Sequence, residues 1–139
     1  MPAITVDDYN ALQAEELPWA VEAGMFCDSL GEGEARLRLP FHPSSLRPGG
    51  TVSGPTMMAL ADACMYAVVL SKIGIVKLAV TTNFSINFLH RPSPADLLAE
   101  GRILKLGKRL AVMDVFIHSE GHDEAVAHAT GTYSLPPRG

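Results

Sequence analysis

Cysteine, basic residues and long apolar runs are scarce in this sequence of 139 residues, and each shortage excludes a class of protein. The two cysteines, Cys27 and Cys64, cannot form a disulfide framework and make no CxxC pair, so we expect free buried thiols in a reducing compartment. The five histidines contain no HExxH motif, and we expect no metal site. Acidic residues outnumber basic ones by 15 to 11, which argues against nucleic-acid binding through a general basic surface.

No apolar run reaches the roughly 20 residues that a membrane-spanning helix needs. The most apolar stretch, residues 55–70, is interrupted by Asp62 and closed by Lys72. The first 19 residues are acidic and mixed in character, unlike the basic and then apolar pattern of a secretory signal peptide. We therefore expect a cytoplasmic protein that binds neither membranes nor nucleic acid.

Apolar residues themselves are plentiful, because they make up 47% of the chain, and this is enough for a packed core. A length of 139 residues lies near the common size of one domain. We expect a single domain over residues 1–139, in which a helical segment over 1–23 precedes a core over 24–135.

Periodicity and the positions of glycine and proline predict the order of the elements. Strict alternation over residues 76–89 predicts a long half-buried strand. Its apolar face carries Val76, Leu78, Val80, Thr82, Phe84, Ile86 and Phe88, and its polar face carries Lys77, Thr81, Asn83, Ser85 and Asn87. The other predicted elements are a surface helix over 7–16 that Asp7 or Asp8 caps, two strands within 25–39, a loop over 40–54, a helix from Pro55 to a stop at Gly74, and strands over 97–106, 110–118 and 125–135.

The predicted helix that starts at Pro55 is apolar on nearly every side, so the rest of the chain must enclose it. The joints at 107–108 and 121–122 are short enough for hairpins, which makes the last three strands antiparallel. We therefore predict an α+β fold in which an antiparallel sheet wraps around one long central helix. A helix lying across a flat sheet is the alternative, but the apolar helix favours the wrapped form.

Asp62 stands in the middle of this apolar helix, with Met58, Met65 and Tyr66 as its neighbours at helical spacing. Burial of an unpaired carboxylate is costly, so such a group is normally paired, protonated, metal-bound or turned toward a wet cavity. One interpretation places Asp62 on the one exposed patch of the helix or against an arginine. The other makes it an active-site base or nucleophile at the edge of an apolar pocket.

The loop RPGGTVSGP, residues 47–55, leads into the same helix, and Ser53 or Gly54 can cap it. Backbone N–H groups at a helix N-terminus favour a negative oxygen, and the Gly54 N–H is the natural donor because Pro55 has none. Asp62 lies eight residues beyond Gly54, which is about 12 Å along a helix. If both act on one carbonyl, they must come from two copies of the chain, so we predict an obligate dimer.

Local basic spots occur at Lys105, Lys108 and Arg109, and separately at His90 and Arg91. Such residues are usually solvated ends of hairpins. They could instead hold a polyphosphate, because ammonium groups and guanidinium forks pair well with phosphate oxygens.

The segment SGPTMMALADACMYA, followed by AVTTNFSINFLHRP, resembles the PaaI-like branch of the hotdog-fold acyl-CoA thioesterases. The motif of that family is His-Gly-Gly, four residues, Leu, any residue and an acidic residue. Ser53-Gly54-Pro55, Leu60 and Asp62 occupy those positions here, and the Leu-Gly-Lys-Arg hairpin also matches in kind. The resemblance covers roughly residues 41–135.

The resemblance implies hydrolysis of an acyl-CoA thioester at a subunit interface, without a metal or cofactor, in a homodimer that pairs further into a dimer of dimers. By position, Asp62 would be the nucleophile or the general base, the Gly54 amide would stabilise the oxyanion, and the Thr81 hydroxyl would help to place the water. The acyl group would enter among Met57, Met58 and Tyr66. The remaining residues assigned to substrate binding are Arg47, Ser53, Asn83, Arg91, Lys108 and Arg109, with the basic spots facing the phosphates of CoA.

The chain departs from the family pattern at three positions. Ser53 stands where the family usually has His, Arg47 stands where it has Asn, and Pro55 replaces the second Gly. Two alternatives therefore stay open beside the thioesterase. One is a hotdog hydratase or dehydratase, which uses a His paired with an acid, and the other is an acyl-CoA-binding protein that has lost turnover.

Overall fold

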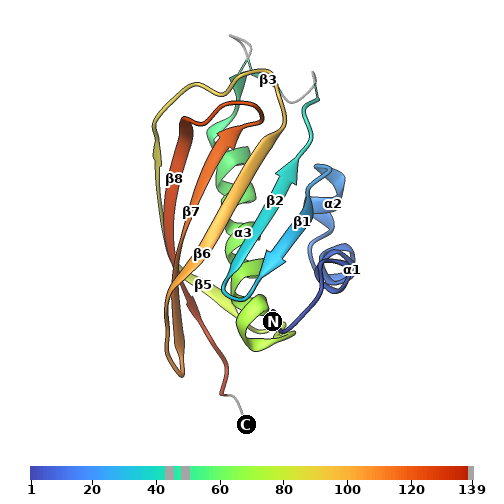
Figure 1. Cartoon of the computed structure of the whole chain (residues 1–139), viewed down its shortest axis with the longest axis vertical. Helices are drawn as coiled ribbons and strands as arrows, with labels where there is room; N and C mark the ends of the chain where they lie inside the picture. Colours follow the sequence, from blue (N-terminus) through green and yellow to red (C-terminus); the bar gives the residue numbers. More distant parts are fainter. Residues whose placement is uncertain (43–45, 48–50, 138–139) are drawn as a thin grey trace.

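The computed structural model of this chain describes residues 1–42, 46–47 and 51–137 (Figure 1). Its elements, in chain order, are α1 (Val6–Glu16), α2 (Pro18–Glu22), β1 (Phe26–Gly31), β2 (Glu34–Leu39), β3 (Leu46–Arg47), β4 (Thr51–Val52), α3 (Gly54–Ile73), β5 (Val80–Phe88), β6 (Leu97–Leu106), β7 (Leu110–Ser119) and β8 (Ala125–Ser134).

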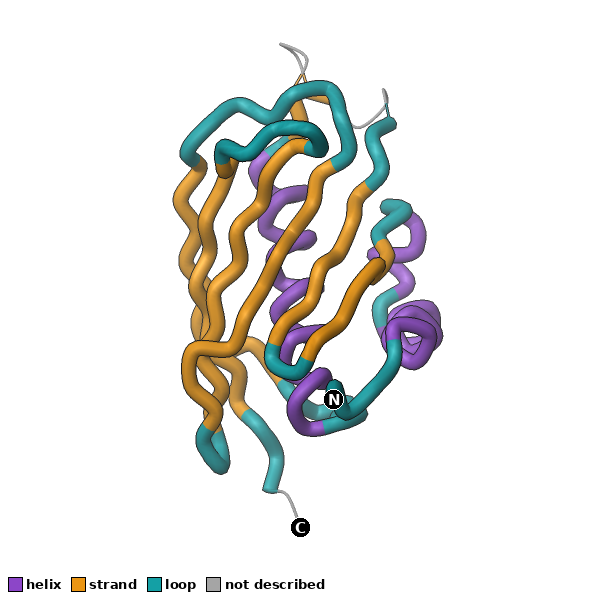
Figure 2. Tube along the Cα trace, viewed as in Figure 1, coloured by secondary structure: helices purple, strands orange, loops and turns teal. Residues whose placement is uncertain are grey.

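Six of the strands form one sheet in the order β1-β2-β6-β7-β8-β5, and every neighbouring pair is antiparallel. The sheet curves around α3, and Figures 1 and 2 show the long helix lying against it. All six strands contact α3. The predicted wrapped arrangement is thus confirmed, and the flat-sheet alternative is wrong.

The central helix α3 has the predicted ends. The Ser53 hydroxyl accepts a hydrogen bond from the Thr56 N–H at its start, and Gly74 closes it with a φ of 82° that favours glycine. By length and hydropathy alone this helix could cross a membrane, but 67% of that window is buried inside the molecule. It is the core helix of the fold, because a helix that is apolar all round must be enclosed.

The N-terminal segment differs from its prediction. Thr5, rather than Asp7 or Asp8, caps α1: its hydroxyl accepts from the Asp8 N–H, and the Asp8 carboxylate accepts from the Thr5 N–H. The helix is also more than a surface element, because Tyr9 is fully buried. Pro18 follows the end of α1 and begins the short helix α2.

Side chains of α1 cover one edge of the sheet. The Asn10 amide accepts from the Cys27 N–H and donates to the Cys27 carbonyl oxygen, at 2.9 and 3.0 Å, and the Gln13 amide donates to the Met25 carbonyl oxygen. These bonds satisfy backbone N–H and C=O groups in and just before β1. Unpaired groups at a sheet edge can otherwise pair with a strand of another chain. At the other edge, no hydrogen bond from any described residue reaches the outer side of β5.

The predicted strands over residues 25–39 and 97–135 are confirmed to within a residue or two, including both hairpins. The inward face of β2 holds the buried residues Ala35, Leu37 and Leu39. The loop over 40–54 contains the short β3–β4 pair, which was not predicted.

Strand β5 corrects two details of the prediction. It begins at Val80 rather than Val76, and it is an edge strand, so most of its residues are exposed rather than half-buried. A bulge between Thr81 and Asn83 shifts its register, because Thr81 lies opposite Tyr133 whereas Asn83 lies opposite Thr132. An extra residue reverses which side chains point inward, so Thr81 faces α3 on the same side as Phe84, not on the opposite face as predicted.

Candidate active site

Asp62 lies midway along α3 and is partly buried. Two neutral hydroxyl groups hold one of its carboxylate oxygens: Thr81 Oγ1 donates to Asp62 Oδ1 at 2.9 Å, and the Tyr133 hydroxyl donates to the same oxygen at 2.9 Å. No described arginine, lysine or histidine forms an ion pair with it. Pairing with an arginine, one interpretation that the sequence left open, is therefore not found among the side chains that the structure describes.

Two hollows meet at this carboxylate. The first has a volume of about 310 Å³ and is mostly apolar; it is lined by Met58, Ala59, Asp62, Thr81 and Phe84. The second has a volume of about 280 Å³ and is lined by Glu16, Leu17, Trp19, Asp62, Ala63, Tyr66, Lys77, Ala79, Val80, Thr81 and Tyr133. Asp62 and Thr81 are common to both, so both hollows border the carboxylate.

The N-terminal helices form a wall of the second hollow through Glu16, Leu17 and Trp19. Sequence analysis assigned no site residue to this segment, because nothing in a short polar helix indicates where it packs. Lys77 enters the same hollow, but its ammonium pairs with Glu15 at 3.3 Å and Glu16 at 3.1 Å. Its charge is thus satisfied without Asp62.

Tyr133 is the residue at Asp62 that sequence analysis missed. It is buried, and burial together with the negative charge of Asp62 raises the pKa of its hydroxyl well above the ordinary value. A signal for it did exist: Tyr133 falls on the inward side of the alternating strand β8, and a buried tyrosine hydroxyl needs a polar partner. Asp62 is the one acidic residue of the helix that this strand faces.

Gly54 and Ser53 lie at the start of α3, far from Asp62 along the same helix. The ring of Phe88 covers Gly54 so closely that a Cβ added there would lie 3.2 Å from the ring. The Ser53 hydroxyl caps the helix and lies 2.8 Å from the Thr56 hydroxyl. Met57 is buried in the core, whereas Met58 reaches the first hollow.

The predicted basic residues are not brought together within one chain. Arg91 is exposed in the loop after β5, and Lys108 and Arg109 are exposed in the turn between β6 and β7, at the opposite end of the sheet (Figure 1). Asn83 is exposed on β5 and lines neither hollow. The side chain of Arg47 lies outside the described part of the structure.

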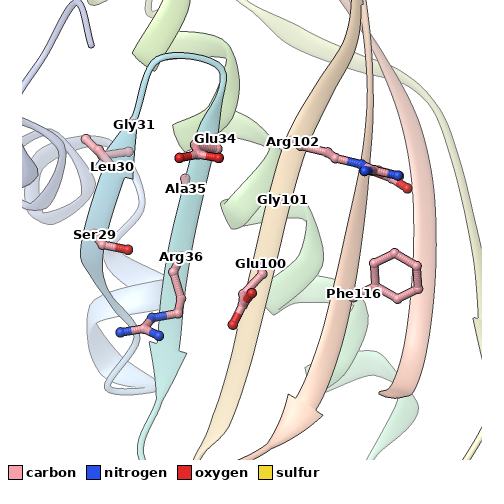
Figure 3. A pocket seen from close by; sticks show the side chains of 11 residues that line it. Ser29, Leu30, Gly31, Glu34, Ala35, Arg36, Glu100, Gly101, Arg102 and Phe116 are labelled. Atoms are coloured by element: carbon pink, nitrogen blue, oxygen red, sulfur yellow. The ribbon is translucent and has the colours of Figure 1, made fainter. Parts of the chain in front are cut away.

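A third hollow of about 420 Å³ lies on the outer face of the sheet, the side away from α3 (Figure 3). Its charges are mostly paired: Arg36 bonds Asp28 at 2.8 Å, and Asp114 accepts from Arg102 at 3.0 Å and is bonded by His128 at 3.0 Å. Burial alone would raise the pKa of Asp114, but the bonds from His128 and Arg102 outweigh it and hold that pKa below its ordinary value. This cluster therefore fits a structural role.

No group of three or more metal-binding side chains occurs among the described residues. His118 and His122 stand four residues apart, but the ring of His118 is bonded to Glu100 and to the backbone of His122. Cys27 and Cys64 are free and buried, as expected, and burial raises the pKa of the Cys27 thiol to about 11.

Residues 49–126, more than half of the chain, match the family model of the thioesterase superfamily. The chain belongs to the thioesterase superfamily. Its wrapped sheet and central helix are the hotdog fold of that superfamily, as the resemblance implied.

Individual relatives agree with this assignment. A solved structure from Silicibacter sp. TM1040, described as a "putative thioesterase", is 45% identical with a TM-score of 0.89, over 99% of this chain and 95% of that one. A "putative esterase" from Saccharolobus solfataricus is 32% identical over 95% of this chain and 86% of its own length. The phenylacetic acid degradation protein PaaI from Thermus thermophilus, solved as a mutant, is 26% identical with a TM-score of 0.75, over 86% of this chain and 99% of that one.

Proposed function

We propose that this member of the thioesterase superfamily hydrolyses acyl-CoA thioesters, with Asp62 as the general base. The observation that carries the proposal is the setting of Asp62. Its carboxylate is held by two hydroxyl groups rather than by a cation, and it borders two hollows. A carboxylate that is oriented by hydroxyl groups and not paired with a cation is placed to take a proton from water.

The proposed reaction uses the two oxygens of Asp62 differently. Oδ1 accepts the bonds from Thr81 and Tyr133, and Oδ2 receives no hydrogen bond from any described residue. Oδ2 takes a proton from water as the water oxygen forms a bond to the thioester carbon. The carbonyl oxygen becomes an oxyanion, which an N–H donor stabilises. When the intermediate collapses, the C–S bond breaks, and the CoA sulfur leaves with the proton that Asp62 had taken.

The N–H donor in this proposal is Gly54 of a second copy of the chain. Gly54 and Asp62 lie on one straight helix, about 12 Å apart at 1.5 Å per residue, so they cannot both reach one carbonyl in a single chain. The uncovered edge of β5 fits the required partner. Exposed apolar side chains gather on and beside this strand, namely Leu78, Val80, Phe88 and Leu89. Side-by-side packing of two copies there would bury them and form two sites.

The substrate would lie with its acyl group in the hollows beside Met58 and Tyr66. Arg91, Lys108 and Arg109 are exposed and form no ion pair with any described residue, so they are free to meet the phosphates of CoA. The name of the Thermus relative concerns phenylacetic acid degradation, which makes an arylacetyl-CoA one sensible test compound.

The hydratase alternative requires a histidine beside the acid. Neither hollow at Asp62 is lined by a histidine, and His90, His118 and His128 are bonded to Glu124, Glu100 and Asp114 respectively. This distribution favours hydrolysis by a carboxylate and a water molecule.

The test is release of free thiol from short, medium and arylacetyl-CoA by the wild-type protein and by Asp62→Asn. We expect turnover of at least one thioester, and a loss of about a hundredfold or more in kcat in the variant. Full activity of Asp62→Asn would contradict the role of Asp62. Binding of acyl-CoA without turnover across the panel would identify an acyl-CoA-binding protein instead.

A further inference from the structure

The hydroxyl of Tyr133 lies at the candidate base and is assigned no role by family membership or by the motif. We propose that Tyr133 is a positioning residue for hydrolysis: its hydroxyl, together with that of Thr81, holds Asp62 Oδ1 in place, so that Oδ2 faces the water. This inference rests on the proposed function, because it concerns the same carboxylate.

The geometry of the contact carries the inference. The Tyr133 oxygen lies 2.9 Å from Asp62 Oδ1 and 3.0 Å from the backbone carbonyl oxygen of Asp62. The hydroxyl thus lies within hydrogen-bond distance of both the side chain and the main chain of the same residue. A carboxylate oxygen bound by both Tyr133 and Thr81 cannot rotate about the side-chain torsions of Asp62 without breaking a hydrogen bond.

The sheet fixes the hydroxyl in turn. Tyr133 lies directly opposite Thr81 in the β5–β8 register, which places both donors next to Asp62 Oδ1. The ring of Tyr133 is 3% exposed and stacks on Tyr66 at 6.5 Å with an interplanar angle of 20°. Packing in the core therefore fixes the position of the Tyr133 ring, and the ring fixes the position of the hydroxyl oxygen.

A tyrosine hydroxyl has one proton to donate, so it serves one of the two acceptors at a time. A hydrogen bond to an ionised carboxylate is stronger than one to a neutral carbonyl, so the proton points to Oδ1 while Asp62 is charged. Once Asp62 has taken a proton from water, the hydroxyl can turn to the backbone carbonyl without movement of the ring. The Tyr133 hydroxyl thereby changes its acceptor when the charge of Asp62 changes, and only its O–H bond has to rotate.

The variant that tests this inference is Tyr133→Phe, which keeps the ring and removes the hydroxyl. A hydrogen bond to a charged group corresponds to about a tenfold to hundredfold change in an equilibrium or a rate, so we expect kcat to fall by about that factor. We expect KM to change by less than about threefold, because the hydroxyl acts on the base and not on the substrate.

Tyr9→Phe is the matched control. Tyr9 is also fully buried and donates its hydroxyl to a carbonyl of α3, that of Ala63 at 3.3 Å, but it lines neither hollow. A general effect of losing a buried tyrosine hydroxyl would lower kcat in both variants. We expect Tyr9→Phe to keep kcat within about threefold of the wild-type value.

A double-mutant cycle separates positioning from simple packing. If Tyr133 acts through Asp62, adding Tyr133→Phe to Asp62→Asn lowers kcat no further. If the two substitutions lower kcat independently, so that the factors multiply in the double variant, the inference is overturned. Equal kcat values for Tyr133→Phe and Tyr9→Phe would also overturn it.

A crystal structure of Tyr133→Phe gives a readout that needs no activity. We expect the Asp62 carboxylate to rotate away from its wild-type position or to occupy two positions, and an unchanged, fully ordered carboxylate would overturn the inference. If the wild-type protein hydrolyses no thioester, the proposed function fails while this structural arm still decides whether Tyr133 positions Asp62.

Discussion

Asp62 and Asp114 are sheltered carboxylates with opposite surroundings, one on each face of the sheet. Asp62, on the helix side, is bound by the neutral hydroxyls of Thr81 and Tyr133. Asp114, on the outer side, is bound by the guanidinium of Arg102 and the ring of His128. Burial does not single out the proposed base here, since Asp114 is the more buried of the two.

The partners explain the difference. Cationic and ring N–H partners hold the pKa of Asp114 below its ordinary value against the effect of its burial, so its carboxylate is a weak base fixed in an ion pair. Hydroxyl partners orient Asp62 without pairing it with a cation, as the proposed general base requires. The two acids should therefore respond in opposite ways to removal of their charge.

The largest expected effect is on the activity of Asp62→Asn. Loss of a general base lowers kcat by about a hundredfold to ten-thousandfold. The free energy of unfolding should change by less than about 1 kcal/mol, because the amide oxygen of Asn still accepts from both hydroxyls. Thiol-release kinetics measure kcat, and chemical denaturation measures the free energy of unfolding. A large loss of stability would indicate that Asp62 has a structural role like that of Asp114.

Asp114→Asn should show the reverse pattern. Removal of the charge leaves Arg102 and His128 without their partner, and we expect a loss of about 2 kcal/mol in the free energy of unfolding. We expect kcat to stay within about threefold. Glu100→Gln is the control on the same face, since Glu100 is exposed and bonded to His118. This variant should lower the free energy of unfolding by less than about 0.5 kcal/mol.

Thr81→Val tests the bulge in β5, which turns Thr81 toward Asp62. Loss of this donor should lower kcat by about tenfold with little change in stability. Thr82→Val is the matched control, because the Thr82 hydroxyl donates to the Thr132 carbonyl and not to the carboxylate. Equal kinetic effects of the two variants would contradict the inward orientation of Thr81.

The smallest effect concerns pH. Because the pKa of Asp114 is lower in the folded chain than its ordinary value of 3.8, its charge stabilises the fold above that pH. As the pH falls below about 4, the carboxyl becomes protonated and this contribution is lost. The stability difference between wild type and Asp114→Asn should thus shrink as the pH falls below about 4. A difference that grows below about pH 4 would contradict the ion pair.

Much of the fold was predictable, because periodicity reports burial directly. The alternation of β2 and the all-round apolarity of α3 required a sheet wrapped around a helix, and the hairpins required antiparallel strands. The position of Asp62 was predictable for the same reason, since a charge inside an apolar helix stands out.

The rest depended on contacts that a linear pattern does not contain. The bulge after Thr81 adds one residue to one strand, and strict alternation assumes that no residue is added. Strand β5 has an apolar pattern like that of a buried strand, yet it lies at an edge. The positions of Tyr133 and Trp19 in the hollow beside Asp62 follow from which elements pack together, and local sequence does not fix that packing.

The central claim is that Asp62 of one copy and Gly54 of another serve one site. Gly54→Pro removes the proposed N–H donor, and proline is tolerated in the first helical turn, after a residue as extended as Ser53 with its ψ of 152°. Gly54→Ala keeps the N–H and controls for crowding against Phe88.

The most direct measurement is the activity of a mixed dimer, made by coexpression of Asp62→Asn and Gly54→Pro with different affinity tags. Each parent should be nearly inactive, and the purified mixed dimer should recover about half of the wild-type activity, because one of its two sites receives both intact groups. A mixed dimer no more active than its parents, or a fully active wild-type monomer, would contradict the claim.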